Sequence, residues 1–211
     1  EGRVPALVQA LRAQVLARYG DFDDPGDYTR IINDGQYQRL RGYLYDARAL
    51  GLDVVELATI NATQSTNERL LPPTLVLEPG DDAKVMQEEI FGPILPIKSY
   101  RNLDEAIAFV NSRDRPLSLY PFSFERESVE KILHHTLAGG VTVNDSLLHF
   151  GINDRPFGGI GPSGMGAYHG RAGFDGFSKA LPILWQSRRA GSDLLKPPYS
   201  KVQRFIDFII R

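Results

Sequence analysis

The sequence predicts an α/β fold, in which an open and mostly parallel sheet is flanked by helices. The first reason is an alternation of period. Between about residues 94 and 144, short apolar runs alternate with segments of helical spacing. Alternating strands and helices with short connections are typical of parallel sheets covered by helices. The second reason is composition, because 42% hydrophobic and 24% charged residues over 211 positions can form a substantial core.

Two helices are expected before the first strands. Apolar residues recur at helical spacing over residues 4–19 and predict an amphipathic helix that ends at Gly20. A second helix is predicted over about residues 34–50, and Gly51 follows it. Its apolar face should hold four side chains, those of Tyr37, Leu40, Leu44 and Ala47.

The remaining elements are shorter. Runs rich in β-branched and aliphatic residues predict strands at about residues 53–57, 74–77, 94–97, 117–122 and 140–144. Helical spacing predicts helices at about residues 104–111 and 126–137. Residues 178–185 are expected to be extended, and a short tail follows Lys196-Pro197-Pro198.

A long loop rich in glycine and aromatic residues runs from Leu147 to Gly170. Long loops in compact domains are usually functional. The loop contains a formal G-x-G-x-x-G from Gly159 to Gly164, but it follows no buried strand and carries Pro162 where a helix would open. We therefore interpret it as a structural loop and not as a dinucleotide fingerprint. His149 and His169 flank these glycines as candidate pocket residues, or as ordinary packed or surface histidines.

Composition excludes several function classes. The formal charge is −2, from 24 basic and 26 acidic residues, which is not the basic balance of a nucleic-acid-binding protein. No apolar run approaches the roughly 18–20 residues of a membrane span. The chain has no cysteine, so it cannot itself supply a disulfide, a thiolate nucleophile or a thiolate metal site. No metal site is predicted, because the histidines lack ligand spacing.

The chain begins with Glu1 and not with methionine, and no signal segment follows. We therefore expect a chain that has been processed, truncated or cut from a longer protein. The absence of cysteine is compatible with a cytosolic protein, and a cytoplasmic location is expected.

Glu88 and Glu89 stand before the segment Ile90-Phe91-Gly92-Pro93. Adjacent carboxylates point in different directions in almost any backbone, so one can be used while the other is solvated. A carboxylate accepts hydrogen bonds through two oxygens and suits the vicinal hydroxyls of a sugar. Phe91 could pack on a flat ring. The alternative is a plain helix end followed by a turn.

Four ordered segments, residues 88–93, 111–120, 139–145 and 156–170, resemble the aldehyde dehydrogenase superfamily. The segments 116–120 and 165–170 are most similar to its class 3 branch, which includes coniferyl aldehyde dehydrogenases. The resemblance covers essentially the whole chain. In that family the nucleophilic cysteine, the oxyanion-hole asparagine, the general-base glutamate and the glycine-rich cofactor fold all lie upstream of the matching region.

The resemblance implies that residues 1–177 are part of a catalytic domain and that residues 178–211 are an oligomerisation strand and tail. The complete enzyme would oxidise an aldehyde, aromatic such as coniferyl aldehyde or long-chain, to the carboxylic acid with NAD or NADP. The reaction would pass through a cysteine thiohemiacetal and thioester. No catalytic residue is assigned within this chain, and the chain alone is expected to be inactive.

The resemblance also assigns binding residues. Glu89 matches the glutamate that holds the nicotinamide-side ribose, and Phe91 matches its aromatic neighbour. Positions that line the aldehyde pocket in class 3 match Leu147, Phe150, Phe157 and His169. The partners implied are an aldehyde substrate and a second subunit in a homodimer, with no nucleic acid and no membrane span.

Two alternatives compete with this interpretation. One is a non-catalytic assembly module that keeps the aldehyde dehydrogenase fold and uses the old subunit-contact surface. The other is a homologous acyl-phosphate or semialdehyde reductase, against which the class 3-like loop argues.

Overall fold

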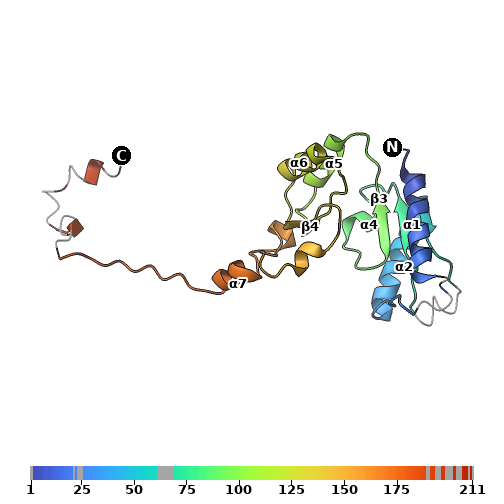
Figure 1. The fold of residues 1–211 in the computed structure, drawn as a ribbon, viewed down its shortest axis with the longest axis horizontal. Coiled ribbons are helices and arrows are strands. Elements are labelled where there is room, and N and C mark those ends of the chain that lie inside the picture. The colour runs from blue at the N-terminus through green and yellow to red at the C-terminus, as the bar shows by residue number, and fades with distance from the viewer. Residues whose placement is uncertain are drawn as a thin grey trace. The chain divides into compact units, whose positions relative to one another are not determined.

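A computed structural model describes residues 2–20, 22, 26–60 and 69–188, followed by residues 191–192, 196–197, 202, 206–208 and 210. The chain divides into two compact units (Figure 1). The first comprises Glu1–Arg113 and Lys131–Thr136, and the second comprises Asp114–Glu130 and Leu137–Arg211. Each unit is described by itself.

The first unit is built around a three-stranded sheet of order β1-β2-β3. Its strands are β1 (Asp53–Glu56), β2 (Thr74–Leu77) and β3 (Ile94–Ile97). β2 and β3 are parallel, with Thr74 opposite Ile94, whereas β1 pairs with β2 in the antiparallel direction. The expected α/β class is confirmed, and the antiparallel edge strand makes this sheet mixed. The alternation of elements predicts neither the pairing of these strands nor the direction of β1.

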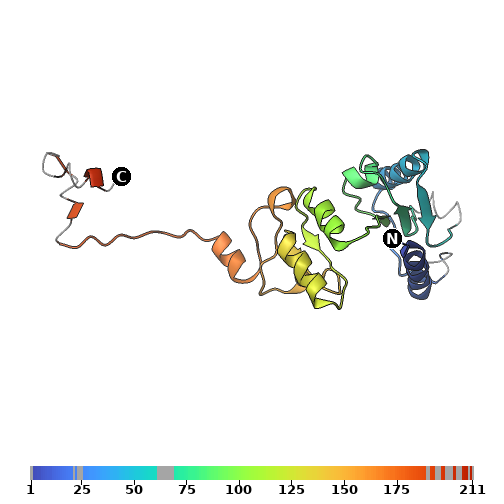
Figure 2. The same cartoon turned by 90° about the horizontal axis from the view of Figure 1, so that it is seen from above.

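Two long helices lie on opposite sides of this sheet (Figure 2). α1 (Val4–Tyr19) ends at Gly20, whose φ of 63° is a conformation that glycine adopts without strain. Its side chains at 4, 8, 11 and 15 are half-buried, while Leu7, expected on the same apolar face, is 44% exposed and no residue of α1 is fully buried. The predicted helix is confirmed, and its apolar stripe is narrower than expected.

α2 (Asp34–Ala49) carries the core of the first unit. Asn33 caps its start, since its side chain accepts a hydrogen bond from the Gln36 amide at 2.9 Å. All four side chains predicted for its apolar face are buried, together with Tyr43. They form one cluster with Leu71, Val76, Ala83, Val85 and Ile94. The structure also describes α4 (Lys84–Gln87) and α5 (Leu103–Asn111) in this unit, and α6 (Arg126–His135) ends in it.

The second unit contains two short parallel strands, β4 (Ser118–Leu119) and β5 (Gly140–Val141). Both are shorter than the expected strands, although the backbone bonding continues, with the Thr142 amide donating to Leu119 O at 3.2 Å and Asn144 to Pro121 O at 2.8 Å. Pro121 has no N–H to return a bond, which ends the regular ladder. Residues 148–176 then form the turns η1 (Leu148–Gly151) and η2 (Gly161–Ser163) and the helix α7 (Gly170–Gly176).

Residues 178–187 follow α7 without a regular helix or a strand partner in the described structure. Four large apolar side chains there are mostly exposed, namely Leu181, Ile183, Leu184 and Trp185. The expected tail from Tyr199 to Arg211 lies largely outside the described residues. Of the helices that the structure describes, none combines the length and the apolar character needed to cross a membrane.

Candidate functional site

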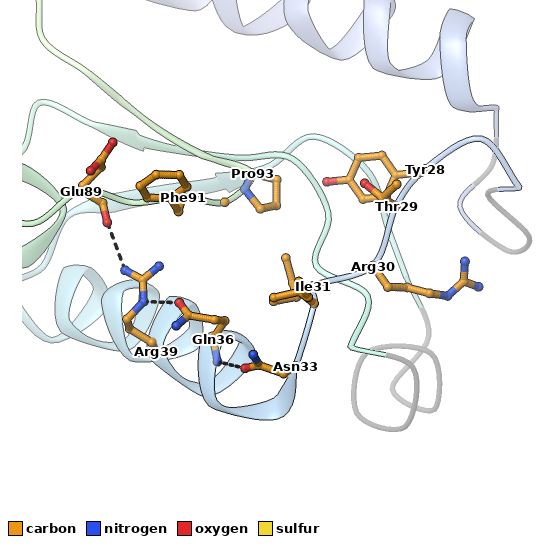
Figure 3. Close-up of a pocket in the computed structure, with 12 residues that line it drawn as sticks. Tyr28, Thr29, Arg30, Ile31, Asn33, Gln36, Arg39, Glu89, Phe91 and Pro93 are labelled. Carbon is orange, nitrogen blue, oxygen red and sulfur yellow. Dashed lines mark hydrogen bonds between the residues drawn. The ribbon is translucent and has the colours of Figure 1, made fainter. Parts of the chain in front are cut away.

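A groove of about 850 Å³ opens in the first unit. One wall is formed by residues 28–33 and by Gln36 and Arg39 of α2 (Figure 3). The other wall is Glu89 with residues 91–93. The groove therefore contains both residues that the sequence nominates for cofactor binding, Glu89 and Phe91.

The two adjacent glutamates have different surroundings. Glu88 Oε2 accepts a hydrogen bond from the Tyr43 hydroxyl at 2.8 Å, and Tyr43 is buried in the core cluster. Burial, with the bond to Glu88, raises the pKa of Tyr43, so that this hydroxyl keeps its proton and can donate. Among the described residues, the Glu89 carboxylate has no hydrogen-bond or ion-pair partner, and Glu89 lines the groove. One carboxylate is thus held by the fold, and the other belongs to a residue that lines the groove.

Phe91 and Gly92 shape the rim beside Glu89. Phe91 is 80% exposed and has a φ of 45°, an uncommon conformation for a residue other than glycine. A Cβ atom on Gly92 would lie 2.5 Å from Leu40 Cδ1, so only glycine lets this segment approach α2 so closely. The Thr74 amide then donates to Pro93 O at 2.9 Å, which joins the rim to β2. The rim is therefore held between α2 and the sheet, and it presents an exposed aromatic ring.

Arg39 is a groove residue that the sequence did not nominate. Its guanidinium donates to the main-chain oxygens of Glu89 at 3.1 Å and Ile90 at 2.6 Å. It also donates to the Tyr43 hydroxyl at 2.6 Å and to Gln36 Oε1 at 2.7 Å. Gln36, Arg39 and Tyr43 are three and four residues apart on one face of α2, which was visible in the sequence. The acceptors of Arg39 on Glu89 and Ile90, about 50 residues later, were not visible in the sequence.

The wall formed by residues 28–33 is held by an aromatic cluster and by two reciprocal hydrogen bonds. Tyr28 packs edge-to-face on Tyr19 and Phe22, with ring centroids 5.1 and 4.9 Å away. Its hydroxyl donates to Leu71 O at 2.9 Å, and burial raises its pKa. The Ile31 amide donates to Arg69 O at 3.1 Å, and Arg69 Nε donates back to Ile31 O at 3.0 Å. The bonds that hold this wall go to Leu71 and Arg69, neither of which lines the groove.

The four predicted aldehyde-pocket residues lie in the second unit, and three of them form a cluster of rings. Phe150 meets Phe157 edge-to-face at 5.3 Å, and Phe157 stacks on His169 at 6.0 Å. Nδ1 of His169 is buried and has no hydrogen-bond partner among the described residues. Leu147 is joined to this cluster through its carbonyl, which accepts the Phe150 amide at 2.9 Å, while its side chain is 67% exposed. The aldehyde-binding role of all four remains a prediction.

His149 is a packed residue. Its Nδ1 is 2.8 Å from Thr142 Oγ1, and its Nε2 is 3.2 Å from Ser118 Oγ. The ring lies so close to Gly140 that a Cβ there would be 2.5 Å from His149 Cδ2. His149 therefore ties η1 to β4 and β5, which agrees with the packed alternative for this residue.

The glycine loop is structural, as predicted. A Cβ at Gly159 would collide with the main chain of Ser163, and one at Gly158 with Gly166 O. The G-x-G-x-x-G stretch forms the three-residue turn η2, and no strand leads into it. Its glycines allow backbone to approach backbone. In the part of the chain that the structure describes, no group of three or more His, Asp or Glu side chains could hold a metal ion.

Comparison with known proteins is consistent with this arrangement. A family model described as the aldehyde dehydrogenase family matches residues 1–181. A probable coniferyl aldehyde dehydrogenase from Pseudomonas aeruginosa is 46% identical over 205 residues, covering 97% of this chain and 42% of that protein. Aldehyde dehydrogenase family 3 member A2 from Mus musculus is 42% identical over 198 residues, covering 92% of this chain and 39% of that protein.

A solved structure described as the substrate-bound state of Staphylococcus aureus AldH aligns with a TM-score of 0.79 and 37% identity. The alignment covers 100% of this chain and 45% of the AldH chain. The chain spans about two-fifths of the length of the curated relatives above. These relatives confirm the class 3-like resemblance, and the family model extends over most of the sequence. The chain therefore belongs to the aldehyde dehydrogenase family.

Proposed function

We propose that this chain is the part of a longer NAD(P)-dependent aldehyde dehydrogenase that supplies one side of the cofactor site and one wall of the aldehyde site. The observation that carries the proposal is the groove of the first unit, where Glu89, whose carboxylate has no partner among the described residues, and the exposed ring of Phe91 share one rim. Family membership supplies the reaction class. The relative named for coniferyl aldehyde favours an aromatic aldehyde.

The residues of the groove fit a dinucleotide. Glu89 offers two acceptor oxygens to the vicinal hydroxyls of a ribose, and Phe91 offers a flat apolar face. A groove of about 850 Å³ is large enough for a substantial part of such a ligand. When bound, the nicotinamide supplies a hydride acceptor. The task of these side chains is to bind and orient it.

The aldehyde wall is proposed to be the ring cluster of Phe150, Phe157 and His169 with Leu147. Aromatic walls suit an aromatic or long apolar aldehyde better than a small polar one. The chain contains no cysteine, so the thiolate that attacks the aldehyde must come from elsewhere in the enzyme. The 211-residue chain alone should therefore not oxidise aldehydes.

The test compares this chain with the longer protein that carries it. Each is mixed with coniferyl aldehyde or a long-chain aldehyde and with NAD⁺ or NADP⁺, and the reduced nicotinamide is followed by absorbance. We expect turnover from the longer protein and none from the chain alone. Aldehyde oxidation by the chain alone at an enzyme-like rate would overturn the proposal, as would a longer protein that binds neither cofactor.

A further inference from the structure

Arg39 places its guanidinium against the backbone that carries the two groove residues. Its four hydrogen bonds go to Gln36 Oε1, to the Tyr43 hydroxyl and to the main-chain oxygens of Glu89 and Ile90. In Figure 3 the bond from Arg39 ends on the main-chain oxygen of Glu89, and the Glu89 carboxylate points away from the guanidinium. The contact is with the segment that holds the carboxylate and not with the carboxylate itself.

We propose that Arg39 is a positioning residue of the cofactor groove: it fixes the backbone of Glu89 and Ile90 and thereby aims the Glu89 carboxylate and the Phe91 ring. This inference rests on the proposed function for its effect on cofactor binding. Its structural part, that Arg39 holds the segment in place, is independent of the ligand.

The segment of residues 88–92 has a backbone conformation that needs to be held by its surroundings. Phe91 holds a φ of 45°, and an uncommon conformation of this kind persists only where the surroundings determine it. On either side of Phe91 the segment is attached to α2. The Glu88 carboxylate accepts from Tyr43, and Gly92 packs directly on Leu40. Arg39 provides the polar attachment between those two points, and the adjacent carbonyls of Glu89 and Ile90 are its acceptors.

The guanidinium is suited to this task because it is a planar group with five donors in a fixed geometry. Its four bonds use four of these five N–H donors, one on Nε, two on Nη1 and one on Nη2. That leaves one donor for a ligand, so a principal role as a direct phosphate or ribose contact is disfavoured. A lysine has three donors on one atom and could not reach the same four acceptors.

The experiment is a double-mutant cycle in the longer protein, with the dissociation constant of the cofactor measured by equilibrium titration. Arg39→Met and Glu89→Gln should each weaken binding by about tenfold, the usual loss for hydrogen bonds that involve a charged group. If Arg39 acts through Glu89 and its segment, the double variant should bind little worse than Glu89→Gln alone. Two independent contacts would instead multiply to about a hundredfold loss, and that result would overturn the proposal.

The control is Arg48→Met on the same helix. Arg48 is half-exposed and pairs with Glu56 at 2.9 Å, away from the groove segment. Its replacement should leave cofactor affinity unchanged. Arg39→Lys should behave like Arg39→Met, because charge without the planar fork does not restore the four bonds. Full rescue of cofactor affinity by lysine would contradict the positioning role.

Hydrogen exchange of the protein without cofactor tests the structural part separately. The amides of Glu88 and Ile94, which donate to Lys84 O and Gly92 O at the two ends of the segment, should exchange faster in Arg39→Met. The Leu57 amide, which donates to Pro73 O, should not change. Unchanged exchange at Glu88 and Ile94, or faster exchange at all three, would overturn the inference. A wild-type protein that binds neither nicotinamide cofactor would overturn the proposed function instead.

Discussion

The Tyr43 hydroxyl donates to the Glu88 carboxylate at 2.8 Å, and this bond separates the roles of two adjacent glutamates. Glu88 is tied by this bond to Tyr43, which is 3% exposed in the core of the first unit. Glu89 follows and lines the groove. The pair thus combines an anchored carboxylate and a groove-lining residue at adjacent positions.

The two glutamates should therefore respond differently to the same substitution. Glu89→Gln removes a charged acceptor from the groove and should weaken NAD(P)⁺ binding by about tenfold. Glu88→Gln retains an amide oxygen that can still accept from Tyr43, so cofactor binding should change by less than about twofold. Equilibrium titration of both variants decides the matter, and equal losses of affinity would contradict the division of roles.

Gly92→Ala should destabilise the fold, because its Cβ would meet Leu40 Cδ1 at 2.5 Å and Leu40 is 0% exposed. Overpacking of this kind costs about 1–3 kcal/mol of unfolding free energy. The matched control is Gly42→Ala in α2, where a Cβ would meet nothing within 4 Å. That change should stabilise by about 0.5–1 kcal/mol, since alanine favours the helix. Urea unfolding should show opposite signs, and a neutral Gly92→Ala would mean that the segment does not pack on Leu40.

Asp81 should stabilise the folded protein near neutral pH, and this contribution should be lost in acid. The Lys98 ammonium donates to its carboxylate at 3.0 Å, and Arg113 lies 2.9 Å away, so the pKa of Asp81 is held below its ordinary value of 3.8. A lowered folded-state pKa stabilises the protein above the ordinary pKa, and this contribution disappears as the pH falls through the folded-state value. Asp81→Asn should thus lower the melting temperature slightly at neutral pH and not at the acid end.

Asp82→Asn provides the control for Asp81→Asn, since it removes the same charge one residue along the chain. Among the described residues, Asp82 makes no ion pair. Melting curves of both variants across the acid range should differ near neutrality and converge as the pH falls. A melting-temperature difference between Asp81→Asn and wild type that stays constant down to the lowest pH would show that the cations do not act through the Asp81 charge.

Phe150→Ala should raise the KM for an aromatic aldehyde in the longer protein and leave cofactor affinity unchanged. Phe150 is 53% exposed and meets the Phe157 ring at 5.3 Å, so its removal shortens the proposed aldehyde wall without emptying a core. Phe174→Ala is the control, because Phe174 is similarly exposed at 66% and lies in α7 under Arg171. Steady-state kinetics with coniferyl aldehyde should separate the two. If Phe150→Ala and Phe174→Ala had the same KM for the aldehyde, Phe150 would not be part of the substrate site.

Trp185 should report on dimer formation. It is the only tryptophan of the chain and is 89% exposed, within an apolar stretch that the family resemblance assigns to subunit contact. Dilution of the longer protein should shift its fluorescence to the red if a partner covers this residue. Leu184→Asp should produce monomers in sedimentation, because a charge would be buried unpaired. A dimer that survives this change would place the interface elsewhere.

Local patterns in the sequence predicted the longer helices α1, α2, α5 and α6 closely and the core of α2 almost completely, whereas the short helices α4 and α7 were not predicted. Tyr37, Leu40, Leu44 and Ala47 follow the 3.6-residue period, and all four are buried. The positions of β1, β2 and β3 were also visible as short aliphatic runs. Their pairing was not, since residues 53–56 run antiparallel to residues 74–77, and nothing in either run encodes the direction of its neighbour.

The candidate site divides in the same way. Glu89 and Phe91 could be nominated from their own motif, because a motif is a local pattern. Arg39 could not be nominated in this way, because its place in the site depends on hydrogen bonds to two carbonyl oxygens about 50 residues away. Main-chain oxygens carry no residue identity, so a side chain that binds them leaves no partner to recognise in the sequence.

The sequence by itself determined the family of this chain, its longer helices, its lack of a cysteine nucleophile and the residues nominated for the groove and the aldehyde wall. The tertiary structure alone decided which glutamate is held and which is presented, why position 92 must be glycine and how Arg39 fastens the segment between them. The physical reason is that periodicity and motifs record what each residue needs of its neighbours along the chain. Hydrogen bonds and close packing between distant segments exist only once the chain has folded.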